Sequence, residues 1–304
     1  MLLVEGILGD RGGAFHPVVL MGKSLRWLEI RLESVGMWNR WGGSLLAVFL
    51  LAFWTGMTSL FFEVSQLGSE WLAYSFLAVL GGWFIACRSL LEHTLTISPG
   101  CDGNLSDMRN AIAMIVGRDT SMMDEDGCRR AGVESLAESL VDGILTPLFF
   151  FALWGVGGIV IFKVISTMDS MVGYRSERYE KFGWAGARLD DVFNWVPARL
   201  SWLLISAVAF LDPRFHGWKA LVIGWRDQHH LPGFNSGWPE ATAAGALDRR
   251  LVGPIWRNGE LETELWIGHQ DSPPCGSPLD LSRARHLTLE VSVFSTLILF
   301  IWLR

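Results

Sequence analysis

The stretch from Trp41 to Phe62, WGGSLLAVFLLAFWTGMTSLFF, decides the fold of this 304-residue chain. Its 22 consecutive residues carry no charge, and a helix of that length matches a hydrocarbon core about 30 Å thick. The composition agrees, because 50% of the residues are hydrophobic, 18% are charged and the mean hydropathy is +0.31. We therefore expect a mainly α-helical, polytopic integral membrane protein.

Further apolar segments follow, and two of them are irregular. Gly155-Val156-Gly157-Gly158 interrupts one, and Asp212-Pro213 ends another after 12 residues, so we expect each to turn back. The sequence predicts one membrane-embedded domain over residues 1–304, with about 3–5 hydrophobic helices or re-entrant segments and with helical loops in the cytoplasm. The apolar segments lie near 41–62, 71–87, 143–162, 200–211 and 287–303.

Charge sets the expected orientation and excludes one class of partner. Basic residues flank the first two apolar segments, whereas the segment between them carries only acids, so the basic flanks should be cytoplasmic. A net charge of −6 and a pI near 5.7 argue against a nucleic-acid partner. The basic residues are Lys23, Arg26, Arg31, Arg40 and Arg88. The four cysteines form no CxxC pair, so we interpret them as reduced, incidental thiols.

An acid-rich helix is expected just before the third apolar segment. A helix over 106–116 should end at Gly117, Arg118 and Asp119 should lie in a turn, and a second helix should begin after Thr120-Ser121. On the second helix three acids recur every four residues and therefore share one face. Their repulsion must be offset by solvent, by an arginine such as Arg130, or by a divalent cation. The three acids are Glu134, Glu138 and Asp142.

A second acid cluster spans 188–199. Asp190, Asp191 and Asn194 have the spacing of an Asp-Asp-x-x-Asn site that holds magnesium on a pyrophosphate or nucleotide, and Arg188 and Arg199 flank them. A capped helix start with acids in its first turn explains the same residues. Both interpretations stay open at this point.

Three smaller polar clusters also adjoin apolar segments. Polar residues beside a membrane helix are costly unless they are used or solvated, which modestly favours a functional role for those at 163–178. The cluster at 235–240 equally fits a Ser-capped turn into a helix over 241–247, and the one at His16-Pro17 fits a polar turn. The residues concerned are Lys163, Asp169, Tyr174, Arg178, His16, Asn235, Trp238 and Glu240.

Taken together, these motifs resemble the cobalamin biosynthesis family called CobD or CbiB, the adenosylcobinamide-phosphate synthases. The resemblance runs from the first ten residues to about Pro254. It rests on Gly9-Asp10, His16-Pro17, Gly22, Gly117-Arg118-Asp119-Thr120, Glu134-Ser135-x-x-Glu138, Asp142-Gly143, Pro147-Leu148, Asp169 to Tyr174, Glu177-Arg178-Tyr179, Phe182-Gly183-Trp184, Ala187 to Asp191, Asn194, Pro197-Ala198-Arg199 and Asn235 to Glu240. The chain departs from the family pattern at Ser139-Leu140, Ser166, Leu231 to Asn235 and after Pro254.

The resemblance implies a multi-pass enzyme of the cell inner membrane with its active site in the cytoplasm. Such an enzyme uses ATP and Mg²⁺ to join aminopropanol or its phosphate to cobyric acid through an amide bond, and association with other cobalamin assembly enzymes is expected. A carboxylate resists attack by an amine until one oxygen becomes a good leaving group, so ATP would convert it to an acyl phosphate.

The resemblance and this chemistry together assign roles as hypotheses. Phosphate-facing and other catalytic groups are Arg118, Asp119, Lys163, Asp169, Arg178, Arg188 and Arg199. Substrate-binding groups are His16, Tyr174, Asn235, Trp238 and Glu240. Metal ligands are Glu134, Glu138, Asp142, Asp190, Asp191 and Asn194.

Two alternatives belong to other functional classes. A membrane carrier or a non-catalytic subunit of corrinoid handling would use polar residues to line a passage, but the polar clusters lie mostly outside the apolar segments. A magnesium-dependent phosphotransferase acting on a lipid head group is suggested only by Asp190-Asp191-x-x-Asn194.

Overall fold

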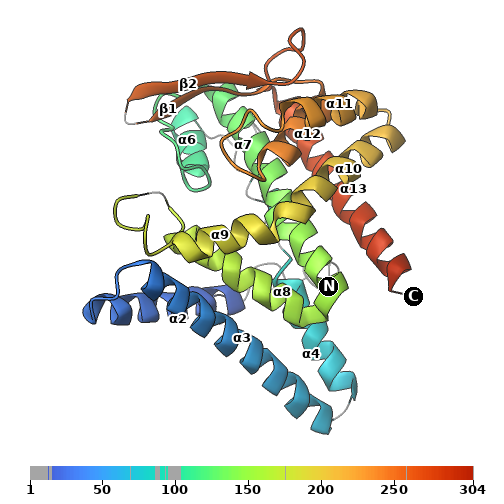
Figure 1. Cartoon of the computed structure of the whole chain (residues 1–304). Helices are drawn as coiled ribbons and strands as arrows, with labels where there is room; N and C mark the ends of the chain where they lie inside the picture. Colours follow the sequence, from blue (N-terminus) through green and yellow to red (C-terminus); the bar gives the residue numbers. More distant parts are fainter. Residues whose placement is uncertain are drawn as a thin grey trace. The chain divides into compact units, whose positions relative to one another are not determined.

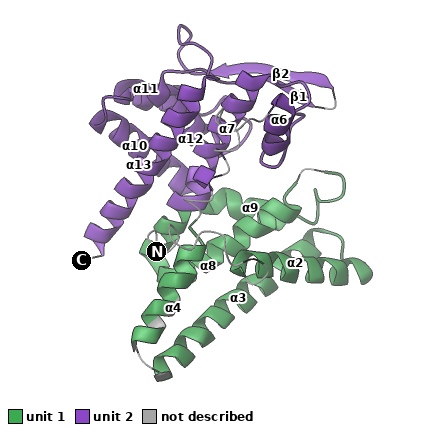
Figure 2. Ribbon diagram, turned by 180° about the vertical axis from the view of Figure 1, so that it is seen from behind, with its two compact units in different colours: residues 1–86, 146–194 green, residues 87–145, 195–304 purple. Residues whose placement is uncertain are grey.

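The computed structural model describes residues 13, 16–68, 70–85, 90–92, 94, 104–174, 176–257 and 259–303. These residues are mainly helical and form two compact units, each assembled from two separate stretches of the chain (Figures 1 and 2). Unit 1 comprises residues 1–86 and 146–194, and unit 2 comprises residues 87–145 and 195–304. The motif at Gly9-Asp10 lies outside the described residues.

Unit 1 is a group of helices around one apolar core. Its helices are α2 (Pro17–Ser34), α3 (Arg40–Gly68), α4 (Glu70–Trp83), α8 (Thr146–Val172) and α9 (Trp184–Phe193). Helix α3, which contains the 22-residue uncharged stretch, packs against α2, α4, α8 and α9. Its inner side chains, such as Leu46 and Leu50, join Ile159 and Ile165 of α8 in the core, while Val48 and Phe53 stay exposed.

The apolar segment near 143–162 folds back on itself, as the glycine-rich interruption predicts. The backbone of α8 leaves helical geometry at Trp154 and at Gly155, where φ is 62° and ψ is −150°. That conformation is essentially restricted to glycine. The chain reversal brings Gly158 against the backbone of Phe150, so that α8 consists of two helices joined by a tight turn (Figure 1).

Unit 2 combines helices with a β-hairpin. The helices are α6 (Leu105–Ala113), α7 (Glu125–Leu140), a π-helical turn (Val141–Leu145), α10 (Trp195–Leu211), α11 (Gly217–Asp227), α12 (Gly237–Leu247) and α13 (Pro278–Trp302). Small residues allow close helix packing: a side chain at Gly245 of α12 would overlap the backbone of Lys219 in α11. After α10 the chain turns at Asp212-Pro213, and α11 packs back against α10.

The hairpin is a feature that the sequence interpretation did not predict. Strands β1 (Leu251–Arg257) and β2 (Glu260–Ile267) pair antiparallel, with a register irregularity between Ile255 and Trp256. The sequence carries Asn258-Gly259 between the strands, a strong two-residue hairpin signal that the helical interpretation overlooked. The stretch from Gly268 to Pro278 is a loop up to the start of α13, as predicted.

Two predicted helix boundaries are wrong, and two interpretations based on helix caps fail. Helix α6 ends at Ala113 and Gly117 does not have the left-handed conformation of a helix-ending glycine, while α7 begins at Glu125 after an Asp124 cap rather than after Thr120-Ser121. Helix α9 begins at Trp184, which places the 190–191 acids near its end and excludes the capped-start interpretation. Ser236 stands at the start of α12, but its side chain makes no capping hydrogen bond.

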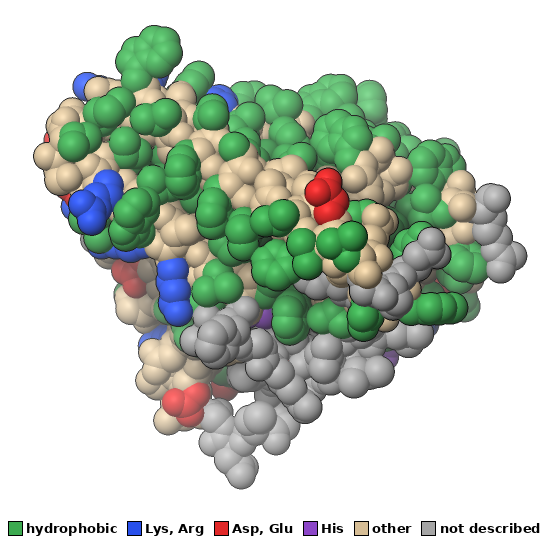
Figure 3. Space-filling model, turned by 90° about the horizontal axis from the view of Figure 1, so that it is seen from below, with side chains coloured by type: hydrophobic (Ala, Val, Ile, Leu, Met, Phe, Trp, Pro, Cys, Tyr) green, Lys and Arg blue, Asp and Glu red, His purple; other side chains and the backbone are tan. Residues whose placement is uncertain are grey.

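The structure confirms a polytopic membrane protein. Within the described residues, four helical segments are long and apolar enough to cross a membrane: Arg40–Leu67, Glu125–Val172, Trp184–Leu211 and Pro278–Trp302. Helix α4 has 14 residues and is shorter than the segment predicted near 71–87. Figure 3 shows a face on which hydrophobic side chains gather with few charges, as expected for contact with lipid.

Candidate functional site

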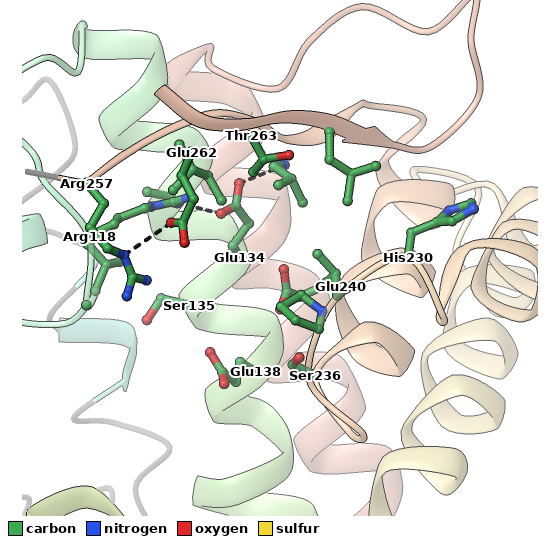
Figure 4. A pocket seen from close by; sticks show the side chains of 18 of the residues that line it. Arg118, Glu134, Ser135, Glu138, His230, Ser236, Glu240, Arg257, Glu262 and Thr263 are labelled. Atoms are coloured by element: carbon green, nitrogen blue, oxygen red, sulfur yellow. Dashed lines mark hydrogen bonds and ion pairs between the residues drawn. The ribbon is translucent and has the colours of Figure 1, made fainter. Parts of the chain in front are cut away.

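Unit 2 contains a cavity of about 550 Å³ that collects residues from separate parts of the sequence (Figure 4). Its walls come from the loop before α7, from α7, from the start of α12 and from the β-hairpin. Four predicted site residues line it: Arg118, Glu134, Glu138 and Glu240. Six further polar residues that the sequence interpretation did not assign line it too: Ser135, His230, Ser236, Arg257, Glu262 and Thr263.

The loop that carries Arg118 is fixed by its neighbour Asp119. The backbone N–H of Asp119 donates to the carbonyl of Trp256 in β1 at 3.0 Å, and its carboxylate accepts from the Ser121 N–H at 2.9 Å. The hydrogen bonds from Ser121 lower the pKa of Asp119 below its usual value. Asp119 therefore holds the loop on the hairpin, which places Arg118 at the cavity wall.

Arg118 and Glu134 form a buried ion pair at this wall. The Arg118 Nη2 atom lies 2.5 Å from Glu134 Oε2, and the two side chains are only 12% and 10% exposed. The other oxygen, Oε1, accepts from the Val252 N–H at 2.9 Å. Val252 has a φ of 72°, which is strained for a β-branched residue, so its N–H is aimed at Glu134 at a conformational cost.

Glu240 is the most unusual group in the cavity. Its side chain comes from the first turn of α12, the residue is 7% exposed, and within the described part of the chain its carboxyl makes no hydrogen bond or ion pair. Burial raises the pKa of Glu240 well above its usual range, and repulsion from Glu138 and Glu134 adds to the rise while Arg118 opposes it. Figure 4 shows Glu240 and Glu138 on the same cavity.

The face shared by the α7 acids ends at Glu138. Asp142 lies beyond the end of α7, in the π-helical turn, where it is half-buried and does not line the cavity. Arg130, which the sequence suggested as a partner for these acids, instead donates to the carbonyls of Val252 and Cys275. Arg118 provides the compensating charge for Glu134.

A second set of predicted site residues lies around Trp238 in unit 2. The Arg199 guanidinium lies 4.3 Å from the Trp195 ring centre and 5.2 Å from that of Trp238, and it donates to Asn235 Oδ1 at 3.2 Å. Cation–π contacts of this kind hold an arginine in a fixed orientation. The structure thus brings together the predicted residues Arg199, Asn235 and Trp238.

In unit 1 the α9 acids are paired with residues on their own helix or at its end. Asp191 accepts from Arg188 at 2.9 Å, and Asp190 accepts from the Asn194 side chain at 2.9 Å. Asn194 is buried, and its carbonyl oxygen accepts from Thr146 at 2.6 Å. These bonds join the end of α9 to the start of α8.

The remaining predicted residues lie in three places in unit 1. His16 caps α2 by accepting from the Val18 N–H, and it lines a second cavity of about 440 Å³ that also contains Lys163. Arg178 lies 3.2 Å from Glu33 of α2, which joins the 176–183 segment to that helix. The oxygens of Asp169 lie against Gly173 at the end of α8, and Tyr174 is exposed.

Magnesium does not have a ready-made site among these residues. Within the described ranges no group of three or more His, Cys, Asp or Glu side chains converges as a metal site. Both oxygens of Glu134 are engaged, Asp191 is paired with Arg188, and Asn194 and Asp190 bond to each other. The predicted ligand set therefore does not fit a protein-only cage, and magnesium stays a prediction.

The cysteines in the described part of the chain form no disulfide bond. Cys128 and Cys275 are buried free thiols, and burial raises the pKa of Cys275 far above its usual value. Cys87 and Cys101 lie outside the described residues.

Comparison with known proteins shows the family to which the chain belongs. The model of the family described as CobD/Cbib protein matches residues 1–288. The "Cobalamin biosynthesis protein CobD" of Yersinia enterocolitica is 37% identical over 97% of this chain and 93% of its own length, and that of Rhodobacter capsulatus is 38% identical over 93% and 88%. The "Cobalamin biosynthesis protein CbiB" of Salmonella arizonae is 36% identical over 96% and 93%. No solved structure matches the chain.

Proposed function

We infer from its membership of the CobD/Cbib family that this membrane protein acts in cobalamin biosynthesis, and we propose that it is the enzyme that amidates cobyric acid. The reaction would join aminopropanol or its phosphate to one propionate of the corrin, at the expense of ATP and with Mg²⁺. The match over nearly the whole chain is the observation that carries the proposal.

The cavity in unit 2 is the proposed place for the amide-forming chemistry. Its lining unites three motifs that carry the family resemblance, from residues 117–120, 134–138 and 235–240. A buried Arg118–Glu134 pair fixes one wall and keeps a guanidinium available beside the space in which an anionic reactant would lie. Fixed charges in a partly enclosed site stabilise developing charge better than mobile ones in water.

We propose magnesium and ATP as co-reactants, and the described residues do not form a magnesium site in advance. Magnesium often binds through one or two carboxylates together with substrate phosphates, so the nucleotide would have to bring part of the coordination. When bound, it would offset the charge on the phosphates. We also propose that the protein lies in the cell inner membrane with this cavity in the cytoplasm, because the reactants are expected there.

Purified protein in detergent, supplied with ATP, Mg²⁺, cobyric acid and aminopropanol or its phosphate, tests the proposal. The expected result is consumption of cobyric acid and appearance of the amide product by mass spectrometry, dependent on all reactants. No product with either amine, from protein that remains folded, would overturn the enzymatic proposal. Binding of cobyric acid without turnover would then favour a corrinoid carrier.

A further inference from the structure

A groove of about 540 Å³ lies in unit 2 between the end of α10 and the middle of α13, two helices that pack side by side. Its volume is in the range of small-molecule sites. One end is polar, where Asp212 and Glu290 line it, and the rest of its wall is apolar. The apolar lining includes Val208, Leu211, Leu289, Val293, Phe294 and Leu297. We call this feature the α10–α13 groove.

The α10–α13 groove extends across the boundary between charged and uncharged sequence. In α13, Glu290 is followed by an uncharged stretch over 291–303, and α10 is uncharged over 200–211 up to Asp212. Both helices belong to segments that are long and apolar enough to cross a membrane. The polar end of the groove therefore lies at the level of lipid head groups, and its apolar wall lies at the level of the acyl chains.

Two carboxylates share one cation at the polar end. The Arg214 Nη2 atom lies 2.6 Å from Asp212 Oδ2, and the same nitrogen forms an ion pair with Glu290. One acid would suffice to hold Arg214 there, and two carboxylates brought onto one nitrogen repel each other. Ionisable side chains at a lipid boundary are costly unless they are paired or used, so the second acid points to a ligand with a positive charge.

A second arginine stands beside this cluster. Arg283 precedes Glu290 by two turns of α13, which puts both on one face of the helix. Its guanidinium donates to the backbone carbonyls of Leu247 and Arg214, and within the described residues it pairs with no acid. The polar end thus has two acids and two arginines around it, which fits a head group that carries both a positive and a negative charge.

We propose that the α10–α13 groove binds a phospholipid with a primary ammonium in its head group, such as phosphatidylethanolamine. The ammonium contacts Asp212 and Glu290, the phosphate faces Arg283, and an acyl chain lies along the apolar wall. A primary ammonium has three N–H donors and one positive charge, which match two carboxylates. A choline head group has the charge without the donors, and a glycerol head group leaves the phosphate charge unbalanced.

A second copy of the chain is the competing occupant, and the charges favour the lipid. Side chains on the groove side of α13 are exposed at spacings of four residues: Leu289 by 43%, Val293 by 48% and Leu297 by 55%. Such a stripe could pack on another helix. A two-fold axis along the membrane normal, however, would bring the acids of both copies to the same depth, where like charges repel.

Native mass spectrometry of the full chain in detergent tests the proposal. The protein is mixed with equal amounts of phosphatidylethanolamine, phosphatidylcholine and phosphatidylglycerol that have the same acyl chains. We expect wild type to retain phosphatidylethanolamine in preference to the other two. Equal retention of all three, a preference for another head group, or a dimer that excludes lipid would each overturn the proposal. The groove shares no lining residue with the cavity of the proposed reaction, so lipid retention is measured without turnover.

Two variants with matched controls locate the lipid. Glu290→Gln should weaken the retention of phosphatidylethanolamine about 10-fold and abolish the preference, while Glu264→Gln, at an exposed acid of β2, should behave as wild type. Leu297→Trp should obstruct the apolar wall and weaken retention without touching the acids. Ile298→Trp, an exposed neighbour that does not line the groove, is its control. Retention that is the same in Leu297→Trp and Ile298→Trp, or a preference that survives in Glu290→Gln, would overturn the site.

Discussion

The cavity acids of unit 2 and the α9 acids of unit 1 look alike in the sequence and differ in the folded chain. Asp190 and Asp191 find partners three or four residues away, at Asn194 and Arg188. Glu134 finds its partners 16 and 118 residues away, and Glu240 finds none within the described chain. A carboxylate with a partner on its own helix is stabilised locally, whereas a buried carboxyl without a partner requires an explanation beyond local sequence.

Among the variants that test this comparison, Arg118→Met should cause the largest loss of stability and turnover. It leaves Glu134 buried without its cation, and breaking a buried pair in this way typically costs about 3–5 kcal/mol. Turnover should fall about 100-fold because the cavity wall is no longer fixed. Thermal unfolding in detergent and the product assay measure the two effects.

A double variant provides the control for Arg118. Arg118→Met with Glu134→Gln removes the buried charge and should recover much of the stability without recovering activity. Arg257→Met, in the exposed ion pair with Glu262, should change stability by less than about 1 kcal/mol. If Arg118→Met and Arg257→Met lose the same amount of stability, the buried Arg118 pair contributes no more than the exposed Arg257 pair.

The turn inside α8 should be the most sensitive backbone position in unit 1. Gly155→Ala forces a side chain into a conformation that only glycine readily adopts, and we expect a loss of about 1–3 kcal/mol. Gly157→Ala, two residues on, has open space and an ordinary φ, so it should be nearly neutral. Unfolding temperatures of the two variants in detergent compare them directly, and similar values would argue against the tight turn.

The pH dependence of stability should reveal the buried carboxyl of Glu240. A pKa raised by folding means that the folded protein binds the proton more tightly, so stability falls as pH rises above the usual glutamate value of about 4.3 and through the raised pKa. Glu240→Gln removes this loss. Its unfolding temperature should match wild type near pH 4.5 and exceed it increasingly toward pH 8. A constant difference across that range would contradict the raised pKa.

Much of the fold followed from the sequence because membrane crossing depends on local composition. The uncharged stretch in α3, the reversal at Gly155 and the last apolar helix were all predicted from length, charge and glycine content. Helix boundaries failed where a better cap competed: Asp124 accepts from the Gly127 N–H and starts α7, in place of the earlier Thr120-Ser121. The β-hairpin was missed although Asn258-Gly259 signalled it.

The sequence predicted which types of residue line the site, but it did not predict which of them contact one another. The i,i+4 spacing put Glu134 and Glu138 on one face, which the cavity confirms as a local arrangement. Spacing could not show that Arg118 pairs with Glu134, or that the Val252 N–H is turned toward it. Those contacts depend on how the hairpin packs on α7, which no local pattern encodes. The catalytic, substrate-binding and metal roles stay predictions.

Asp191→Asn should have the smallest effect on stability and decides whether the α9 acids are a site at all. Its pair with Arg188 is largely exposed, at 47% and 35% for the two side chains, and exposed pairs contribute less than about 1 kcal/mol. If Asp191 reaches magnesium on a bound nucleotide, the half-saturating Mg²⁺ concentration for turnover should rise several-fold, and excess Mg²⁺ should restore the rate. Glu125→Gln, at an exposed acid on α7 that also pairs with an arginine, controls for loss of a surface charge. If turnover depends on Mg²⁺ concentration in the same way in both variants, Asp191 is not a magnesium ligand. Its hydrogen bond with Arg188 is then the local pairing of a surface acid.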